Sequence, residues 1–302
     1  MLTCYSSPHY FAPLPPGHVF PMSKFPDSAR AIAQLPNAQV LDPGMISEHD
    51  LLKVHTPDYV RSILTGRYNE RTQQKLGLPW SPELARRSRC ATAGTLRAAE
   101  IALKQGLAAN LAGGTHHAFP DRGEGFCVFN DIAVTIRVLH ELEPYMQFMV
   151  VDLDAHQGNA TNFIFQHDRN VFTYSLHVGK NYPSRKEPGS LDVELPRWAS
   201  ASDYFTALKS TLPKAIDEFD PDLVFYIAGA DPHIDDRFGQ MCLSTEDMAH
   251  RDEWTIEQIR SRRIPMVITY GGGYNKTPGM TAKLHVQTIQ IAANFCDLVQ
   301  IG

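Results

Sequence analysis

Four short apolar runs, mostly in the second half of the chain, each have Asp, His or Gly at or near the carboxyl end. They are "VVDLDAH" at 150–156, "NVFTYSLHV" at 170–178, "DLVFYIAGA" at 222–230 and "IPMVITYGGG" at 264–273. Runs of this length, rich in Val, Ile, Phe and Tyr, are typical of strands buried on both faces of a parallel sheet. Stretches with apolar residues at helical spacing, 200–219 and 244–263, lie between them. The sequence therefore predicts an α/β fold with a central, mostly parallel β-sheet flanked by helices on both faces.

The rest of the chain gives weaker signals. Residues 46–64 have apolar positions at helical spacing and open with the capping-box pair Ser47 and Asp50, which predicts a helix. The proline-rich residues 8–26 predict an irregular surface segment, and residues 67–80 predict a long loop. Because no repeat, low-complexity tract or linker divides the sequence, we expect one domain over residues 1–302.

Composition and charge exclude several classes of function. The net charge is −5 and no run of five or six like charges occurs, so we expect neither a nucleic-acid interface nor a basic membrane-binding face. No apolar stretch approaches the roughly 20 residues of a membrane-spanning helix, and the first residues lack the features of a signal peptide. The five cysteines are widely spaced and odd in number, which predicts reduced thiols. A cytoplasmic protein is expected.

Polar side chains follow the apolar runs at their carboxyl ends, where open α/β sheets bind ligands. Asp152, Asp154 and His156 share one face if the strand continues that far, and Asp231 follows a second run. Two carboxylates and one imidazole neutralise a divalent cation and leave positions open for water and substrate, as catalytic metal sites do. Asp154 and Asp231 would otherwise be helix or loop caps. The oxygen-rich donor set does not exclude Fe²⁺ or Mn²⁺.

The sequence "LAGGTHH" places His116 and His117 on a turn led by glycines. Their rings are expected to diverge, so both cannot easily be satisfied as core residues, whereas a histidine pair in a cleft suits acid–base chemistry near neutral pH. The alternative is two surface histidines on a loop. Asp152 and Asn159, which flank the ligand motif, are available to hold the second nitrogen of each ring.

A tyrosine follows the last apolar run in "TYGGGYNK". The glycines, among them Gly272 and Gly273, allow the backbone to approach a ligand closely. The hydroxyl of Tyr274, held near a metal-bound carbonyl, would donate a hydrogen bond to a developing oxyanion. The alternative is a turn before a helix.

Taken together, these motifs resemble the zinc-dependent histone deacetylase family, which has the arginase–deacetylase fold. The segments that carry the resemblance occur in the order of the family: "LLKVHTPDYV", "GGTHH", "GFCVFND", "DLDAHQGN", "YSLH", "AGADPHIDDRFG" and "GGGY". The motif "DLDAHQGN" and the short chain length make the sequence most similar to class IV of the family and its bacterial relatives.

The resemblance implies a role for each matching residue. It implies that Zn²⁺ is held by Asp154, His156 and Asp231, with His117 as general base and acid, His116 as electrostatic helper and Tyr274 as oxyanion donor. It implies an acyl-lysine channel walled by Gly125 and Phe126, with Tyr182 facing Phe126, and Gly272 and Gly273 beside it. It further implies a structural potassium ion near Asp152, Ser175 and Leu176, with oxygen atoms from Asp154 and His156.

One position departs from most of the family. Asn159 stands where most members have Asp, although class IV shares the asparagine. A neutral amide favours an imidazolium less than a carboxylate does, so His117 is expected to be neutral more readily.

These implications predict metal-assisted hydrolysis of acyl-lysine in proteins or peptides, with acetyl or longer fatty acyl groups. An acetylpolyamine amidohydrolase would need an acidic entrance and usually a dimer-forming insertion. Arginase-type chemistry would need further Asp and His ligands, but positions 158 and 159 are Gly and Asn. A catalytically silent acyl-lysine-binding protein is the third alternative, and the oligomeric state is left open.

Overall fold

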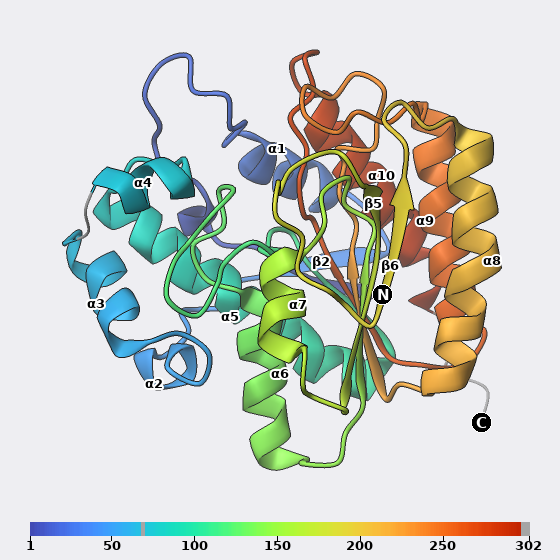
Figure 1. The fold of residues 1–302 in the computed structure, drawn as a ribbon, viewed down its shortest axis with the longest axis horizontal. Coiled ribbons are helices and arrows are strands. Elements are labelled where there is room, and N and C mark those ends of the chain that lie inside the picture. The colour runs from blue at the N-terminus through green and yellow to red at the C-terminus, as the bar shows by residue number, and fades with distance from the viewer. Residues whose placement is uncertain (68–69, 297–302) are drawn as a thin grey trace.

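Eight strands form one sheet in the computed structural model, which describes residues 1–67 and 70–296 of the chain (Figure 1). The strand order is β2-β1-β3-β8-β7-β4-β5-β6, and every pairing between these strands is parallel. The strands are β1 (Leu2–Tyr5), β2 (Ala38–Leu41), β3 (Leu107–Asn110), β4 (Phe148–Asp152), β5 (Val171–Val178), β6 (Leu191–Leu195), β7 (Leu223–Ile227) and β8 (Met266–Thr269). The predicted parallel sheet is confirmed.

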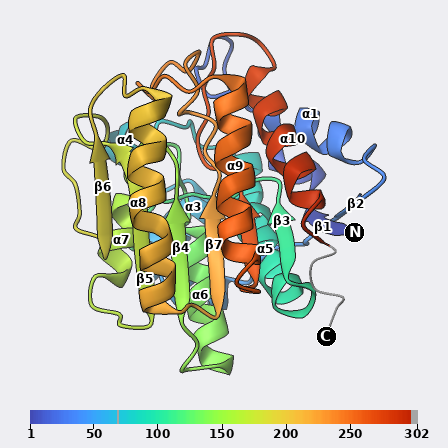
Figure 2. The same ribbon diagram turned by 90° about the vertical axis from the view of Figure 1, so that its right-hand side faces the viewer.

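Helices cover both faces of this sheet (Figures 1 and 2). One layer consists of α5 (Pro82–Gln105), α6 (Asp131–Leu142) and α7 (Asn159–Phe165). The opposite layer consists of α1 (Lys24–Ile32), α8 (Ala201–Phe219), α9 (Thr245–Arg260) and α10 (Met280–Ala293). None of the helices in the described part of the chain is both long and apolar enough to cross a membrane.

The central strand β4 shows why the sheet is stable between two helical layers. Phe148 and Val150 pack in a core that includes α5 and α6, whereas Met149 and Val151 pack in a core that includes α8 and α9. All four side chains are at most 1% exposed. Alternate residues of a strand point to opposite faces, so a strand buried on both sides is apolar throughout.

The prediction of one helix over residues 46–64 was wrong, because this segment forms two helices. Ser47 does cap the first one, α2 (Glu48–Leu51), because its side chain accepts a hydrogen bond from the Asp50 backbone N–H. The second, α3 (Pro57–Thr65), begins afresh at Pro57 with Thr56 as its cap. Proline favours the first turn of a helix and interrupts a helix interior.

Two further expectations were wrong. The predicted loop at 67–80 contains helix α4 (Glu70–Leu76), and its residues 68 and 69 lie outside the described residues. The segment 8–26 is not a surface segment throughout, because Tyr10, Phe20, Met22 and Phe25 are buried in the core. Strands β1, β2, β3 and β6 were not predicted.

The order of the strands positions the site. Strands β3, β8, β7 and β4 are consecutive neighbours, and because they are parallel their carboxyl ends share one edge. The loops that follow them therefore lie side by side, although they are far apart in the sequence.

Candidate active site

Each of these four loops brings one part of the site to the edge of the sheet. The loop after β3 carries the two histidines, and the loop after β8 carries Tyr274. The loops after β4 and β7 carry Asp154 with His156, and Asp231. Strand β4 ends at Asp152, so Asp154 and His156 lie in the loop, not on the strand face.

Asp154, His156 and Asp231 converge as a candidate metal site. Each offers one ligand atom, and these atoms all lie within 4.8 Å of one another. Nδ1 of His156 lies 3.0 Å from both Asp154 Oδ1 and Asp231 Oδ2. The backbone N–H of Gly272 donates to Asp154 Oδ2, and that of Ala155 donates to Asp231 Oδ1. Two carboxylates and an imidazole held in this way fit a divalent metal ion.

The glycine run beside the carboxylates is required by their proximity. A Cβ atom on Gly272 would lie 2.2 Å from Asp231 Oδ2 and 2.7 Å from Asp154 Oδ2. Only glycine allows the backbone to pass this close to the metal site. Gly273, in contrast, lies against Ala230 and Thr281.

His116 and His117 lie beside the metal site, and both are 4% exposed. Their ring centroids are 4.0 Å apart, so the rings lie together and do not diverge as expected. Nδ1 of His116 is 2.6 Å from Asp152 Oδ2, and Nδ1 of His117 is 2.8 Å from Asn159 Oδ1. The structure thus contains the two contacts that the sequence suggested.

The two partners give the neighbouring imidazoles different proton affinities. Burial lowers the pKa of His116, but the negative charges of Asp152 and Asp154 outweigh burial and raise that pKa to about 9. Burial and the positive charges of His116 and His156 hold the pKa of His117 well below its usual range. His117 is therefore neutral at pH 7. Because Asn159 accepts from Nδ1, the Nε2 atom of His117 is the free base.

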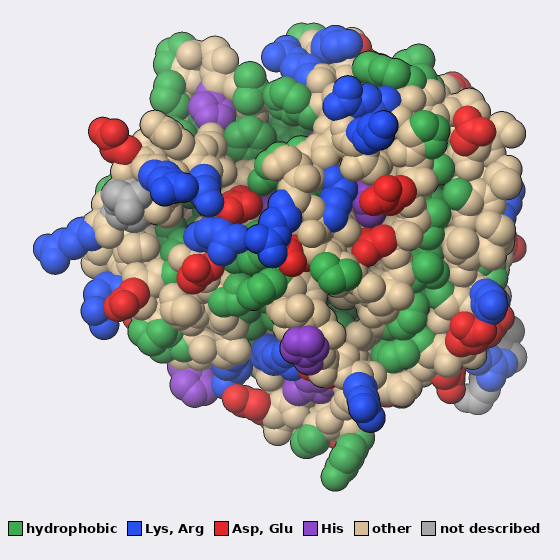
Figure 3. Space-filling model, in the orientation of Figure 1, with side chains coloured by type: hydrophobic (Ala, Val, Ile, Leu, Met, Phe, Trp, Pro, Cys, Tyr) green, Lys and Arg blue, Asp and Glu red, His purple; other side chains and the backbone are tan. Residues whose placement is uncertain are grey.

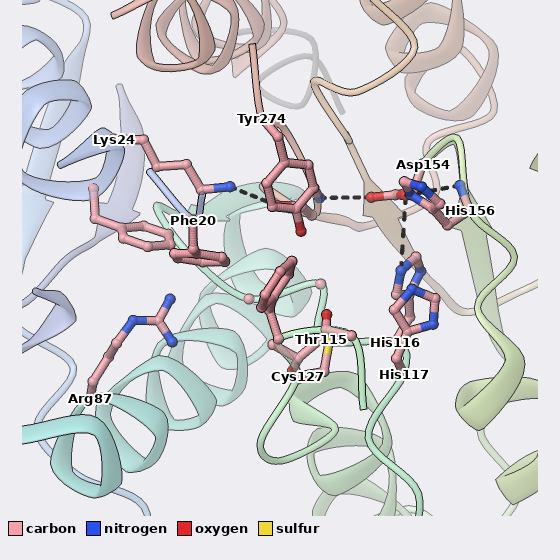
Figure 4. Close-up of a pocket in the computed structure, with 17 residues that line it drawn as sticks. Phe20, Lys24, Arg87, Thr115, His116, His117, Cys127, Asp154, His156 and Tyr274 are labelled. Atoms are coloured by element: carbon pink, nitrogen blue, oxygen red, sulfur yellow. Dashed lines mark hydrogen bonds and ion pairs between the residues drawn. The ribbon is translucent and has the colours of Figure 1, made fainter. Parts of the chain in front are cut away.

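Tyr274 closes the site from the other side, with its phenol group directed into the pocket (Figure 4). Its ring packs against Phe126 and Phe238, with centroid distances of 5.5 and 5.3 Å. Its backbone N–H donates to Asp236 Oδ2 over 2.6 Å. Burial, followed by the charges of Asp154 and Asp231, raises the pKa of Tyr274 well above its usual range, so the hydroxyl stays a donor.

A cavity of about 350 Å³ leads from the surface to these groups. Gly125, Phe126 and Tyr182 line it together with His117, His156 and Tyr274. Tyr182 was expected to face Phe126; both line this cavity, but the ring of Tyr182 packs against His117 at 4.9 Å. Among the residues that the structure describes, the charged ones that line the cavity are Lys75 and Arg237, with no Asp or Glu. Lys and Arg side chains gather on the upper half of the face in Figure 3.

The structure shows where the residues of the predicted potassium site lie, but it does not test whether they bind the ion. Asp152 and Ser175 are register partners on β4 and β5, and Leu176 follows in the buried part of β5. Ser175 Oγ lies 2.9 Å from Nδ1 of His177. This site stays a prediction.

Sequence reasoning missed several residues that hold the loops in place. Asp131 accepts from the backbone N–H groups of Gly114 and Thr115, which fixes the turn before the histidines. Asp131 belongs to the motif "GFCVFND" and Asp236 to the motif "AGADPHIDDRFG". Membership of these motifs was the one sign in the sequence that could have identified the two residues. A single acid in a loop or at the start of a helix has no periodic pattern that would identify it.

Arg251 of α9 is a second type of missed residue. Its side chain is fully buried, and its Nη1 donates to the backbone oxygens of Gly229, at 2.7 Å, and Leu153, at 3.4 Å. These residues lie just before the candidate metal ligands Asp231 and Asp154 in the chain. Asp252 balances its charge at 2.7 Å. Charged residues on a helix usually face solvent, so the sequence carried no sign of this role.

Comparison with known proteins shows the family to which the chain belongs. Residues 21–289 match the family model of the histone deacetylase domain. Histone deacetylase 2 of Arabidopsis thaliana is 30% identical over 247 residues, which cover 79% of this chain and 64% of the plant protein. The chain belongs to the histone deacetylase family.

Two further relatives and one solved structure are also similar to this chain. An uncharacterized protein of Picosynechococcus sp. is 38% identical over 272 residues, 89% of this chain and 91% of that protein. The acetoin utilization protein AcuC of Staphylococcus aureus is 29% identical over 78% of this chain and 67% of AcuC. The crystal structure of a histone deacetylase (HDAC) homolog complexed with SAHA has a TM-score of 0.80 at 24% identity, covering 96% of this chain and 83% of its own. That likeness confirms the fold.

Proposed function

We propose that this protein is a zinc-dependent hydrolase that removes acyl groups from the ε-amine of lysine in proteins or peptides. The observation that carries the proposal is the convergence of Asp154, His156 and Asp231 with a neutral His117 and the Tyr274 hydroxyl at the end of one cavity. Family membership supports the same chemistry. Acetyl groups are candidate substrates, and the class IV-like features of the sequence make longer fatty acyl groups candidates beside them.

The metal ion would be held by Asp154, His156 and Asp231. Zinc held there would supply Lewis acidity, which would polarise the acyl carbonyl and make a water molecule more acidic. Fe²⁺ is the alternative ion for this donor set. The buried carboxylates, each fixed by a backbone N–H, keep the donor atoms oriented toward one point.

The other residues of the site move protons and hold charge. Nε2 of His117 accepts the proton of the attacking water while Asn159 holds its Nδ1. The water oxygen bonds to the acyl carbon, and the Tyr274 hydroxyl donates to the oxyanion that develops. When the C–N bond breaks, His117 returns the proton to the leaving lysine amine. His116, protonated by its pairing with Asp152, adds positive charge beside these steps.

The cavity favours an acyl-lysine over an acetylated polyamine. Gly125, Phe126 and Tyr182 give an apolar wall suited to the lysine methylenes. A polyamine substrate carries further positive charges, which an acidic entrance would attract, yet this cavity is lined by Lys75 and Arg237. A silent binding protein would have no need of the complete set of proton-transfer groups.

A panel of substrates tests this function. Peptides that carry acetyl- to myristoyl-lysine, and acetylated polyamines, are incubated with metal-stripped protein with and without added zinc. We expect hydrolysis of acyl-lysine peptides that depends on zinc and is abolished by a chelator. Absence of turnover for every acyl-lysine peptide with zinc-loaded protein would show that the proposal is wrong.

A further inference from the structure

An inner cavity lies next to the metal site and continues the channel. It has a volume of about 40 Å³ and shares His117, His156 and Tyr274 with the larger cavity. A single bound water needs only roughly 10–15 Å³, so the inner cavity has room for several non-hydrogen atoms. An acyl group whose carbonyl reaches the metal site would extend its chain into this space.

Two buried cations line the inner cavity. Lys24 is 2% exposed and Arg87 is 5% exposed. Nζ of Lys24 donates to the Gly271 carbonyl at 3.3 Å, and Nε of Arg87 donates to the Tyr10 carbonyl at 3.0 Å. In Figure 4 both side chains lie on the side of the pocket opposite the two histidines. They come from α1 and α5, which are separate parts of the fold.

In the described part of the chain, neither cation is in direct contact with a carboxylate, although the negative charges of Asp231, Asp154 and Asp236 act on Lys24 from a greater distance. Within residues 1–67 and 70–296, no carboxylate oxygen lies within 4.0 Å of the charged nitrogens of Lys24 or Arg87, and the terminal amino groups of Arg87 have no acceptor. The ring of Phe25 lies 5.3 Å from Lys24 Nζ and 4.5 Å from Arg87 Cζ, which offsets only part of the cost of burial. Burial, with the charge of Arg87, lowers the pKa of Lys24 to about 8. Two neighbouring buried cations of this kind are suited to an anion.

We infer that the inner cavity binds a carboxylate at the end of the acyl chain, so that the preferred substrates carry malonyl- or succinyl-lysine. This inference rests on the proposed function and names its substrate class. The terminal carboxylate lies one methylene beyond the reacting carbonyl in malonyl and two in succinyl. The free amino groups of Arg87 offer the planar fork that binds a carboxylate with two hydrogen bonds, and Lys24 adds a further charged donor.

Matched substrates isolate the contribution of the charge. Malonyl-lysine is compared with 3-methylbutanoyl-lysine, and succinyl-lysine with 4-methylpentanoyl-lysine, in one peptide; each pair differs in charge but hardly in shape. We expect the charged member to have a kcat/KM at least about tenfold higher, as hydrogen bonds to charged groups predict. Arg87→Met and Lys24→Met should each bring this ratio toward one, and Arg87→Lys should retain part of it.

The controls separate this inference from the proposed function. If acetyl-lysine peptides are hydrolysed but the charged members have no advantage, the inference is wrong and the proposed function stands. If no peptide is hydrolysed, the binding of the succinyl and 4-methylpentanoyl peptides to the Tyr274→Phe variant is measured by calorimetry. About tenfold tighter binding of the succinyl peptide supports the carboxylate site, and equal binding of the two peptides overturns it. Thermal unfolding checks each variant, and should Arg87→Met not fold, Lys24→Met and Arg87→Lys give the same comparison.

Discussion

Nδ1 of His117 lies 2.8 Å from the side-chain oxygen of Asn159, a neutral partner, whereas the adjacent His116 has the carboxylate of Asp152 as its partner. Burial and the positive charges of His116 and His156 keep His117 neutral, whereas the negative charges of Asp152 and Asp154 keep His116 protonated. Only one of the two neighbouring imidazoles can therefore accept a proton at neutral pH.

The first prediction concerns the Asn159→Asp variant. A carboxylate at this position stabilises the imidazolium, so the pKa of His117 rises. Because the base must be unprotonated, activity should then be lost at a higher pH, and the acid limb of the kcat/KM profile should move upward. The profile of each protein is measured between pH 5 and 8. An unmoved acid limb would count against His117 as the base or against its pairing with Asn159.

The second prediction concerns the hydroxyl of Tyr274. Loss of one oxyanion donor typically lowers the rate by about 10²–10³-fold, so Tyr274→Phe should lose activity to that extent. Its thermal unfolding should change little, since the ring keeps its contacts with Phe126 and Phe238. Tyr145→Phe is the matched control, because Tyr145 is 91% exposed. Full turnover by Tyr274→Phe would exclude the assigned role.

The third prediction concerns the metal ligands. Asp231→Asn removes one of the two negative charges that balance the cation, so the purified variant should hold far less than one zinc per chain. Asp235→Asn, in the same loop, is the control, because an amide oxygen can still accept the hydrogen bond from the Thr277 backbone N–H. Elemental analysis of both proteins after zinc loading is the measurement. Stoichiometric zinc in Asp231→Asn would contradict the ligand set.

The parts of the fold that could be predicted are those with strong local patterns. Strands β4, β5, β7 and β8 are apolar on both faces, so they were visible as runs. In contrast, the short strands β1 and β3 are buried but contain no Val, Ile or Phe, and the edge strand β2 alternates between half-buried and exposed positions. Such short strands are defined by their neighbours in the sheet, which the sequence does not show.

The candidate site divides in the same way. Its reacting groups occur in motifs with distinctive chemistry, and the strand order brings them together as the motifs implied. The buried cations around these reacting groups do not occur in such motifs. Arg251 looks like an exposed helical residue, and Lys24 lies in a segment that appeared irregular. Their roles follow from tertiary packing, because it is the surrounding elements that bury each charge.

The last prediction tests Arg251 as a positioning residue. Arg251→Met leaves Asp252 buried without its cation, which should lower the free energy of unfolding by about 3–5 kcal/mol. Adding Asp252→Asn removes the unpaired charge while an amide oxygen still accepts from the Tyr226 hydroxyl, so stability should recover in part. Zinc affinity should not recover, because the hydrogen bonds to the Gly229 and Leu153 carbonyls are still missing. Denaturant unfolding and zinc titration of both variants provide the two measurements. Recovery of zinc affinity in step with stability would mean that Arg251 serves the fold alone and does not orient the loops that carry the metal ligands.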